Sequence, residues 1–312
     1  MPPFSLMPAT TNASSLHTFE MLLPGPLDIP ASLELFRRSG DDLIDRWDGA
    51  TLVRTQPIGE QKVAYACTVA GTIDAPALHV AIEDVRCHEA IEQALKVSFV
   101  VAPPEFAALV RADPILAALN ERYRGLRTIL QFDLLAALVR SISAQQVNLR
   151  WAVTTRRRLA EAFGERHTIG QRFVYSLNAE RLAAASVEEI RALQFTTRKA
   201  EYIIGVARAI ADDKLNLATL VQLSDEEIIA RLTALRGIGR WTAEWILARS
   251  LGRPVVVAGD LGVRKAVGLA YLGTSLPSEK AVRQATAHWG TSSAIAQTLL
   301  LASLSQSASP ML

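Results

Sequence analysis

The spacing of the apolar residues changes once along the chain, close to Pro103 and Pro104. Before this point, short segments alternate between apolar and polar residues, which is typical of half-buried strands. After it, apolar residues recur at the three- and four-residue spacings of amphipathic helices, and we expect no further strand. Because prolines restrict the backbone and interrupt regular structure, this pair predicts a boundary between two structural units.

The chain is therefore expected to be an α+β protein with an N-terminal unit and a helical core. Residues 17–103 are predicted to form an antiparallel sheet with flanking helices. The strand-like segments are HTFEMLL, KVAYACTVAG and ALHVAIE, and the segments ASLELFRRS and HEAIEQALKV have the pattern of short helices. Residues 104–304 are predicted to be all-helical. The ends, residues 1–16 and 305–312, are predicted to be disordered tails.

The composition limits the cellular context. The longest aliphatic runs are far shorter than the ~20 residues that span a membrane, and the N-terminal segment lacks the basic and apolar regions of a signal peptide. Cys67 and Cys87 are the only cysteines, which excludes a four-cysteine iron–sulfur cluster and argues against a disulfide framework. We expect a cytoplasmic protein with no membrane partner.

Charge is unevenly distributed, although the net charge of the whole chain is only +2. Residues 1–103 hold 13 acidic and 7 basic side chains, a net charge of −6. Residues 231–265 hold 7 basic and 2 acidic side chains, a net charge of +5. A local basic excess suits contact with a phosphate backbone, but a basic face exposed only to solvent has the same composition.

The stretch LRGIGRWTAEW, residues 235–245, places two glycines between two helix-like segments and predicts a helix-hairpin-helix over residues 225–251. Gly237 and Gly239 permit a tight turn and the close approach of another surface. The backbone N–H groups at the start of the second helix, together with its dipole, suit a phosphate. A tight helix–helix corner that binds nothing shows the same pattern.

A candidate catalytic carboxylate follows this hairpin. An apolar run from Pro254 to Ala258 leads to Gly259 and Asp260, and a helix is predicted from Leu261 onward. An aspartate at this position is a natural N-cap, and the helix N-terminus favours its ionised form. An ionised carboxylate beside a phosphate-binding turn can stabilise positive charge on a sugar or orient a water molecule.

Taken together, LRGIGRWTAEW and the segment VAGDLGVRK about twenty residues later resemble the helix-hairpin-helix DNA glycosylase superfamily. Within it, the chain is most similar to the bacterial 3-methyladenine DNA glycosylases of type II. The segments ILQFDLLAALVRSISAQQVNLRWA and TTRKAEYIIGVARAI are similar to helices of that family. The N-terminal unit is similar to the extra N-terminal domain of the same subfamily, so that the resemblance extends over residues 17–300.

The resemblance implies a monofunctional glycosylase that excises alkylated purines by base flipping, the first step of base excision repair. It implies a monomer that binds double-stranded DNA containing alkylated bases, in association with the nucleoid. It implies no cofactor for catalysis and no iron–sulfur cluster. Trp241 stands where strand-cleaving members carry a nucleophilic lysine, which argues against lyase chemistry. The alternatives are a helix-hairpin-helix protein that binds DNA without catalysis, and a bifunctional glycosylase/lyase for oxidised bases.

The same resemblance assigns roles to individual residues. Asp260 falls on the position of the catalytic aspartate, and Gln146 on the residue that fills the gap left by the flipped-out nucleotide. The DNA-binding residues that it implies are Gln146, Gly237, Ile238, Gly239 and Arg240. The backbone carbonyl groups that it implies for a monovalent cation bridging to DNA belong to Thr233, Leu235 and Ile238.

Three tryptophans fall on positions that line the base pocket of the family: Trp241, Trp245 and Trp289. Trp241 and Trp245 are one helical turn apart and share a face, which suits either a hydrophobic core or a stacking wall. An aromatic wall attracts a positively charged alkylpurine. Ser293 stands where the family commonly has an arginine, and this departure bears on the shape of the pocket or on a backbone contact.

Overall fold

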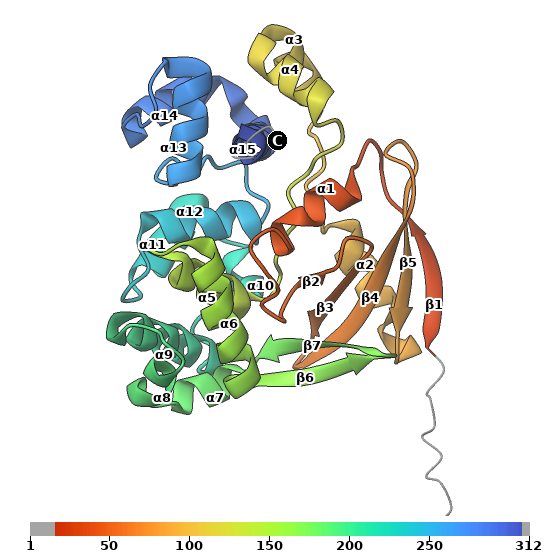
Figure 1. The fold of residues 1–312 in the computed structure, drawn as a ribbon, viewed down its shortest axis with the longest axis vertical. Coiled ribbons are helices and arrows are strands. Elements are labelled where there is room, and N and C mark those ends of the chain that lie inside the picture. The colour runs from red at the N-terminus through yellow and green to blue at the C-terminus, as the bar shows by residue number, and fades with distance from the viewer. Residues whose placement is uncertain (1–15, 308–312) are drawn as a thin grey trace, which may run out of the picture.

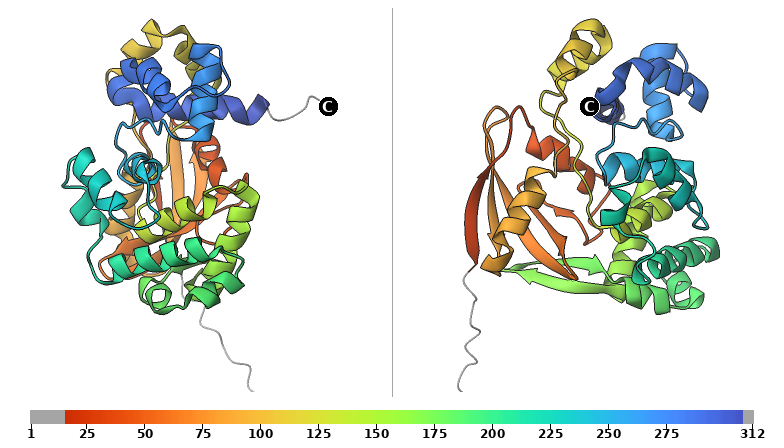
Figure 2. Two further views of the ribbon diagram at one scale, coloured as in Figure 1. Left: turned by 90° about the vertical axis from the view of Figure 1, so that its left-hand side faces the viewer. Right: turned by 180° about the vertical axis from the view of Figure 1, so that it is seen from behind.

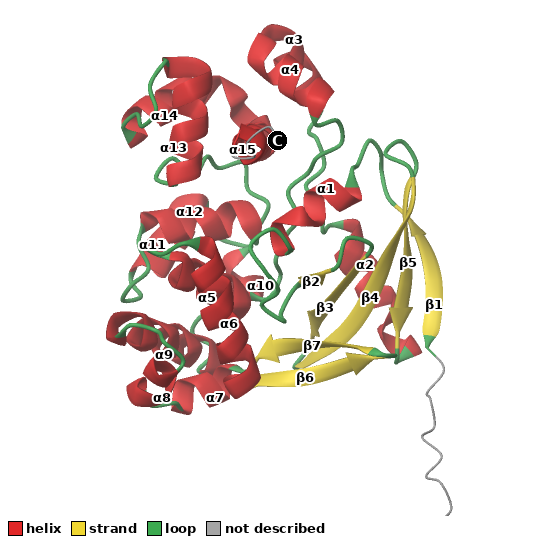
Figure 3. Ribbon diagram, in the orientation of Figure 1, coloured by secondary structure: helices red, strands yellow, loops and turns green. Residues whose placement is uncertain are grey.

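The computed structural model describes residues 16–307; residues 1–15 and 308–312, which form most of the two predicted tails, lie outside it. An antiparallel sheet lies on one side of the molecule and most of the helices on the other (Figure 1). Figure 3 shows the same division by colour. The predicted α+β class is confirmed.

The N-terminal unit is built on a five-stranded antiparallel sheet with the order β1-β5-β4-β3-β2. Its strands are β1 (His17–Leu22), β2 (Arg46–Trp47), β3 (Thr51–Ile58), β4 (Gln61–Gly71) and β5 (Pro76–Ile82). The three predicted strand segments are β1, β4 and β5, whereas β2 and β3 have no counterpart in the prediction. A core that includes Trp47, Tyr65 and Ile91 joins the sheet to α1 (Ile29–Leu33) and α2 (His88–Lys96).

The remaining helices are α3 (Phe106–Ala112), α4 (Pro114–Arg122), α5 (Leu134–Ala144), α6 (Leu149–Phe163), α7 (Ala179–Ala184), α8 (Val187–Ala192), α9 (Thr197–Ala211), α10 (Leu217–Leu220), α11 (Asp225–Thr233), α12 (Arg240–Arg249), α13 (Leu261–Val267), α14 (Glu279–Thr286) and α15 (Ser293–Ser307). One apolar cluster holds α5 to α12 together, and a second joins α13 to α15 with α4. Both views in Figure 2 show the C-terminal helices as a separate layer. Within residues 16–307, no helix is long and apolar enough to cross a membrane.

The stretch expected to be wholly helical contains a β-hairpin, formed by β6 (Gly164–Ile169) and β7 (Arg172–Leu177). Val174 of this hairpin packs against Val53 and Ala66 of the main sheet, and Figure 1 shows the hairpin below that sheet. The expectation of an all-helical core was wrong here, because the two strands bury their apolar faces against the other unit. The hairpin therefore ties the helical core to the N-terminal unit.

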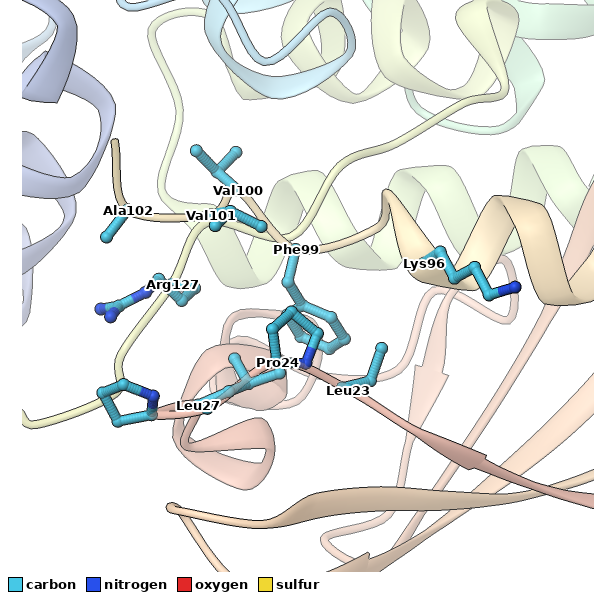
Figure 4. Close-up of a pocket in the computed structure, with 11 residues that line it drawn as sticks. Leu23, Pro24, Leu27, Lys96, Phe99, Val100, Val101, Ala102 and Arg127 are labelled. Atoms are coloured by element: carbon cyan, nitrogen blue, oxygen red, sulfur yellow. The ribbon is translucent and has the colours of Figure 1, made fainter. Parts of the chain in front are cut away.

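An open apolar pocket of about 110 Å³ lies on the N-terminal unit. It is lined by residues 23–27 and 99–102, together with Lys96 and Arg127 (Figure 4). The rings of Pro24 and Phe99 lie at its centre, and the charged ends of Lys96 and Arg127 point away from them. None of the predicted site residues lines this pocket, so the candidate site lies elsewhere.

Candidate active site

The turn between α11 and α12, residues 234–239, is the predicted helix-hairpin-helix turn. Gly237 has a φ of +88°, and a Cβ atom added to it would lie 2.2 Å from the ring of Tyr202. Gly239 has a φ of −92°, and its Cβ position has no neighbouring atom within 4 Å beyond the adjacent residues. Gly237 is therefore required by the fold, whereas Gly239 leaves open space at the N-terminus of α12.

The N-terminus of α12 is suited to an anion. Gly239 is its N-cap, and no side chain caps the first turn, so the first N–H groups of the helix point outward without intrahelical partners. The side chains of Arg236 and Arg240, which are 74% and 62% exposed, flank the turn, where they pair with Glu201 and Glu244. The N–H groups, the helix dipole and the two guanidinium groups together favour a phosphate.

Asp260 is the N-cap of α13, as predicted. Its Oδ1 accepts a hydrogen bond from the backbone N–H of Val263 at 3.0 Å, and its Oδ2 accepts one from the indole N–H of Trp241 at 3.2 Å. A Cβ atom on Gly262 would lie 3.1 Å from Oδ1, so the glycine leaves space for the carboxylate. These contacts hold a half-buried carboxylate where the two helical layers meet.

A second charged group lies near this carboxylate. Burial and, to a smaller extent, the positive charge of Arg38 lower the pKa of Arg249 to about 10, although the carboxylate of Asp260 acts to raise it. Arg249 is the last residue of α12, whereas Arg38 belongs to the N-terminal unit. Arg249 therefore lies within electrostatic reach of both the carboxylate of Asp260 and the cation of Arg38.

The three predicted pocket tryptophans lie in different environments. Trp241 is half-buried and donates to Asp260. Trp245 is half-buried one turn further along α12 and packs against the main helical cluster. Trp289 is 2% exposed and belongs to the cluster of α13 to α15, so in this structure it serves core packing. The aromatic group that the structure brings to the carboxylate is Trp241.

Gln146 lies in the loop of residues 145–148 between α5 and α6, which we call the α5–α6 loop. It is exposed and has a φ of +54°, a left-handed conformation that a non-glycine residue adopts only at a cost. The side-chain amide of Gln145 donates to the carbonyl oxygen of Gly237 at 3.2 Å. The α5–α6 loop and the hairpin turn therefore form one continuous surface.

Three exposed apolar side chains adjoin Gln146. Val147, Leu149 and Trp151 are 37%, 51% and 39% exposed. None of them is a candidate site residue from the sequence, because helical periodicity assigns apolar residues to a core. The available signal was their position immediately after Gln146. Their exposure adds an apolar rim to the surface that carries Gln146 and the hairpin turn.

The carbonyl groups expected to hold a cation lie at the end of α11 and in the hairpin turn. Thr233 ends α11, and carbonyl oxygens in the last turn of a helix lack intrahelical partners and lie at the negative end of its dipole. The carbonyl oxygen of Leu235 accepts one hydrogen bond, from the N–H of Ile238 at 3.1 Å. Backbone oxygens are ligands that a hard monovalent cation accepts. The cation site itself stays a prediction.

The fold and the site define a helix-hairpin-helix protein in which the first turn of α12 contacts a carboxylate. Residues 139–291 match the family model described as the HhH-GPD superfamily of base excision DNA repair proteins. This part of the chain, which includes the α5–α6 loop, the hairpin turn and Asp260, belongs to that superfamily.

Individual relatives agree with this assignment. The chain is 32% identical over 175 residues to YfjP of Bacillus subtilis, a protein whose name classes it with the DNA-3-methyladenine glycosylases; this covers 56% of the chain and 60% of the relative. It is 29% identical over 186 residues to the DNA-3-methyladenine glycosylase of the same organism, 59% of the chain and 61% of the relative. The chain thus spans about three fifths of the length of these curated relatives.

A solved structure extends the similarity of fold beyond the superfamily segment. The 3-methyladenine DNA glycosylase from Archaeoglobus fulgidus superimposes with a TM-score of 0.80 at 24% identity, over 91% of this chain and 97% of that chain. Because the match covers nearly the whole chain, the N-terminal unit is part of the shared fold.

Proposed function

We propose that this protein is a monofunctional DNA glycosylase that excises alkylated purines, such as 3-methyladenine and 7-methylguanine, from double-stranded DNA. The observation that carries the proposal is the hydrogen bond from Trp241 to Asp260, which joins an aromatic ring and a carboxylate directly beside the hairpin turn. The names of the two Bacillus subtilis relatives support the class of substrate.

In the proposed complex, the hairpin turn binds the DNA backbone. The N–H groups at Gly239 and the start of α12 hold a phosphate without reading a base. Because the glycosidic bond is inaccessible inside the duplex, the damaged nucleotide is extruded before the reaction. Gln146, exposed on the α5–α6 loop, occupies the gap that it leaves and can hydrogen-bond to the orphaned partner base.

The chemistry follows from the charge of the substrate. An alkylated purine already carries positive charge, so its N-glycosidic bond breaks without a strong general acid, and the base leaves with the bonding electron pair. The face of Trp241 attracts the cationic base, an interaction worth up to about 2 kcal/mol when desolvated. Asp260 stabilises the positive charge that develops on the sugar and orients the water that adds to C1′. The water loses a proton to solvent, and an abasic site remains.

The proposed reaction leaves the DNA strand intact. Trp241 supplies no amine where a lyase needs one to form a Schiff base. We expect borohydride to trap no covalent adduct between the protein and methylated DNA, and strand breaks to appear only after alkali. A trapped adduct, or cleavage before alkali, would contradict the monofunctional assignment and favour the glycosylase/lyase alternative.

DNA affinity is expected to depend strongly on salt, despite a net charge of only +2. Phosphate contacts release condensed counterions, so a surface with three or four such contacts should lose about 40- to 150-fold in affinity between roughly 50 and 200 mM salt. Replacing exposed Arg236 by glutamine should reduce the slope of log affinity against log salt by about one. An affinity that stays constant over this range would contradict the basic-face interpretation.

We further propose that excision needs no cofactor and that the protein acts as a monomer at the nucleoid. A monovalent cation held by the carbonyls of Thr233, Leu235 and Ile238 would serve DNA binding only. Replacing potassium by tetramethylammonium at equal ionic strength should then weaken the binding of duplex DNA, because the larger ion cannot enter a ring of backbone oxygens.

Incubation of the wild-type protein with methylated duplex DNA tests the proposed function. We expect chromatography to show free methylpurines that accumulate with time. A protein that binds the duplex and releases no base would instead be the non-catalytic helix-hairpin-helix protein. No observation in the structure favours that alternative, because phosphate binding by the turn does not require the contact between Trp241 and Asp260.

A further inference from the structure

We propose that Asp42, in the N-terminal unit, is a positioning residue for Gln146, because it ties together the two helices that flank the α5–α6 loop. The inference rests on the proposed function, in which Gln146 fills the gap left by the extruded nucleotide. It gives the N-terminal unit a role in recognition of DNA, although that unit holds none of the residues proposed to touch the substrate.

Five buried charged side chains join the N-terminal unit to the helical core. We call them the Asp42 cluster: Asp42, Asp45, Arg54, Arg140 and Arg156. Oδ2 of Asp42 accepts from Nε of Arg156 at 2.9 Å and pairs with Nη2 of Arg140 at 3.1 Å. Oδ2 of Asp45 accepts from the same Nη2 at 2.7 Å, and its Oδ1 pairs with Arg54 at 3.0 Å. None of the five side chains is more than 13% exposed.

The cluster reaches both sides of the α5–α6 loop. Arg140 lies near the end of α5, and Arg156 lies on α6. Nη1 of Arg156 also donates to the hydroxyl of Ser143 at 2.9 Å, and that hydroxyl donates to the carbonyl oxygen of Arg140 at 2.9 Å. Asp42 therefore holds the end of α5 and the body of α6 through one carboxylate oxygen.

Residues of the helical core also hold the end of α5 and the start of the α5–α6 loop. Nζ of Lys199 donates to the carbonyl oxygen of Ser143 at 2.8 Å, and Gln145 donates to the carbonyl oxygen of Gly237. The residues on the N-terminal side of Gln146 are thus fixed between the Asp42 cluster and the hairpin turn. A side chain that enters a base stack needs such support, since the stack opposes its insertion.

The charges of the cluster make its geometry sensitive to Asp42. Burial alone would raise the pKa of Asp42, but the guanidinium groups of Arg140 and Arg156 outweigh it and hold that pKa below its usual range. The carboxylate is therefore ionised at neutral pH. Without its charge, the three buried arginines of the cluster would share the single carboxylate of Asp45, and buried cations lacking a counterion move apart or toward water.

A matched control exists at the other end of α5. Lys62 on β4 pairs with Asp133, the N-cap of α5, and donates to the carbonyl oxygen of Leu177 at 2.9 Å. This ion pair also joins the N-terminal unit to the helical core, but it lies far along the helix from Gln146. Lys62→Met therefore weakens the contact between the units without loosening the α5–α6 loop.

The test compares how strongly each protein prefers a duplex with a gap. Affinity is measured for a duplex with a tetrahydrofuran abasic-site analogue and for the intact duplex of the same sequence. Asp42→Asn is expected to lower the ratio of the two affinities about 10-fold, and Lys62→Met to leave it within about twofold. Thermal unfolding of each variant shows that the proteins compared are folded at the assay temperature.

Two results would overturn the proposal: an unchanged ratio for Asp42→Asn, or an equal fall for Lys62→Met, which would show a general loss of rigidity. If Asp42→Asn does not fold, the same ratio of affinities is measured for Ser143→Ala. This substitution removes only the hydrogen bond by which Arg156 holds the end of α5. The measurement needs no catalysis. Failure of the wild type to excise methylpurines would therefore count against the proposed function and not against this inference.

Discussion

Asp260→Asn is expected to slow release of the methylated base by about 10²- to 10³-fold, the loss that follows removal of a preorganised electrostatic group from a transition state. Asparagine caps a helix as well as aspartate does, and its side-chain oxygen can accept from Val263 or Trp241 as Asp260 does. The substitution therefore removes the negative charge and preserves the local structure. Single-turnover release of free methylpurine from a duplex measures the effect.

Asp28→Asn provides the matched control for this prediction. Asp28 is also a half-buried N-cap aspartate, and its Oδ1 accepts from the N–H of Ala31 at 2.9 Å. It lies in the N-terminal unit, so its substitution should leave base release unchanged. Equal losses in the two variants would mean that Asp260 acts only as a helix cap, and full activity of Asp260→Asn would remove it from the mechanism.

Gly237→Ala and Gly239→Ala are expected to have different effects, the first on stability and the second on DNA binding, although both glycines lie in one turn. At Gly237 the added methyl group would meet the ring of Tyr202, and the positive φ adds strain of roughly 1–2 kcal/mol. Overpacking adds about 1–3 kcal/mol, so denaturant unfolding should show a loss of several kcal/mol. At Gly239 the fold has room, so stability should change by no more than about 1 kcal/mol.

The two variants are also expected to differ in their affinity for duplex DNA. The open space at Gly239 is where the proposed phosphate approaches the N-terminus of α12, so a methyl group there should weaken the affinity for duplex DNA in a folded protein. A stable Gly237→Ala protein would contradict the packing role of that glycine. Full DNA affinity in Gly239→Ala would show that the turn is only a helix–helix corner.

Much of the fold could be predicted because the apolar periodicity reports directly on burial. The helix-hairpin-helix and the N-cap at Asp260 are local features, and local patterns specify them. The β6–β7 hairpin could not be recognised from helical periodicity, since Val174 is buried in a cluster that it shares with Val53 and Ala66 of the other unit. Alternation in the segment RFVYSL was the signal that could have found it.

The site was less accessible to prediction where its contacts are distant in sequence. Asp260 could be predicted as an N-cap from its place just before a helical segment. Its hydrogen bond to Trp241, however, spans 19 residues and depends on how α12 packs against α13. The pairing of Asp42 with Arg156 spans 114 residues, and nothing in the local sequence indicates it. Trp289 was predicted to line the pocket and is buried in the core instead. An aromatic residue suits both environments equally, so the sequence alone could not distinguish a core residue from a pocket wall.

The central claim is that this protein excises alkylated purines without cutting the strand. It is tested most directly with two duplexes of identical sequence, one carrying a single 7-methylguanine and the other 8-oxoguanine at the same position. The account predicts free 7-methylguanine from the first duplex, a strand that breaks only after alkali, and no base from the second. Release of 8-oxoguanine with cleavage before alkali, and none of 7-methylguanine, would contradict it.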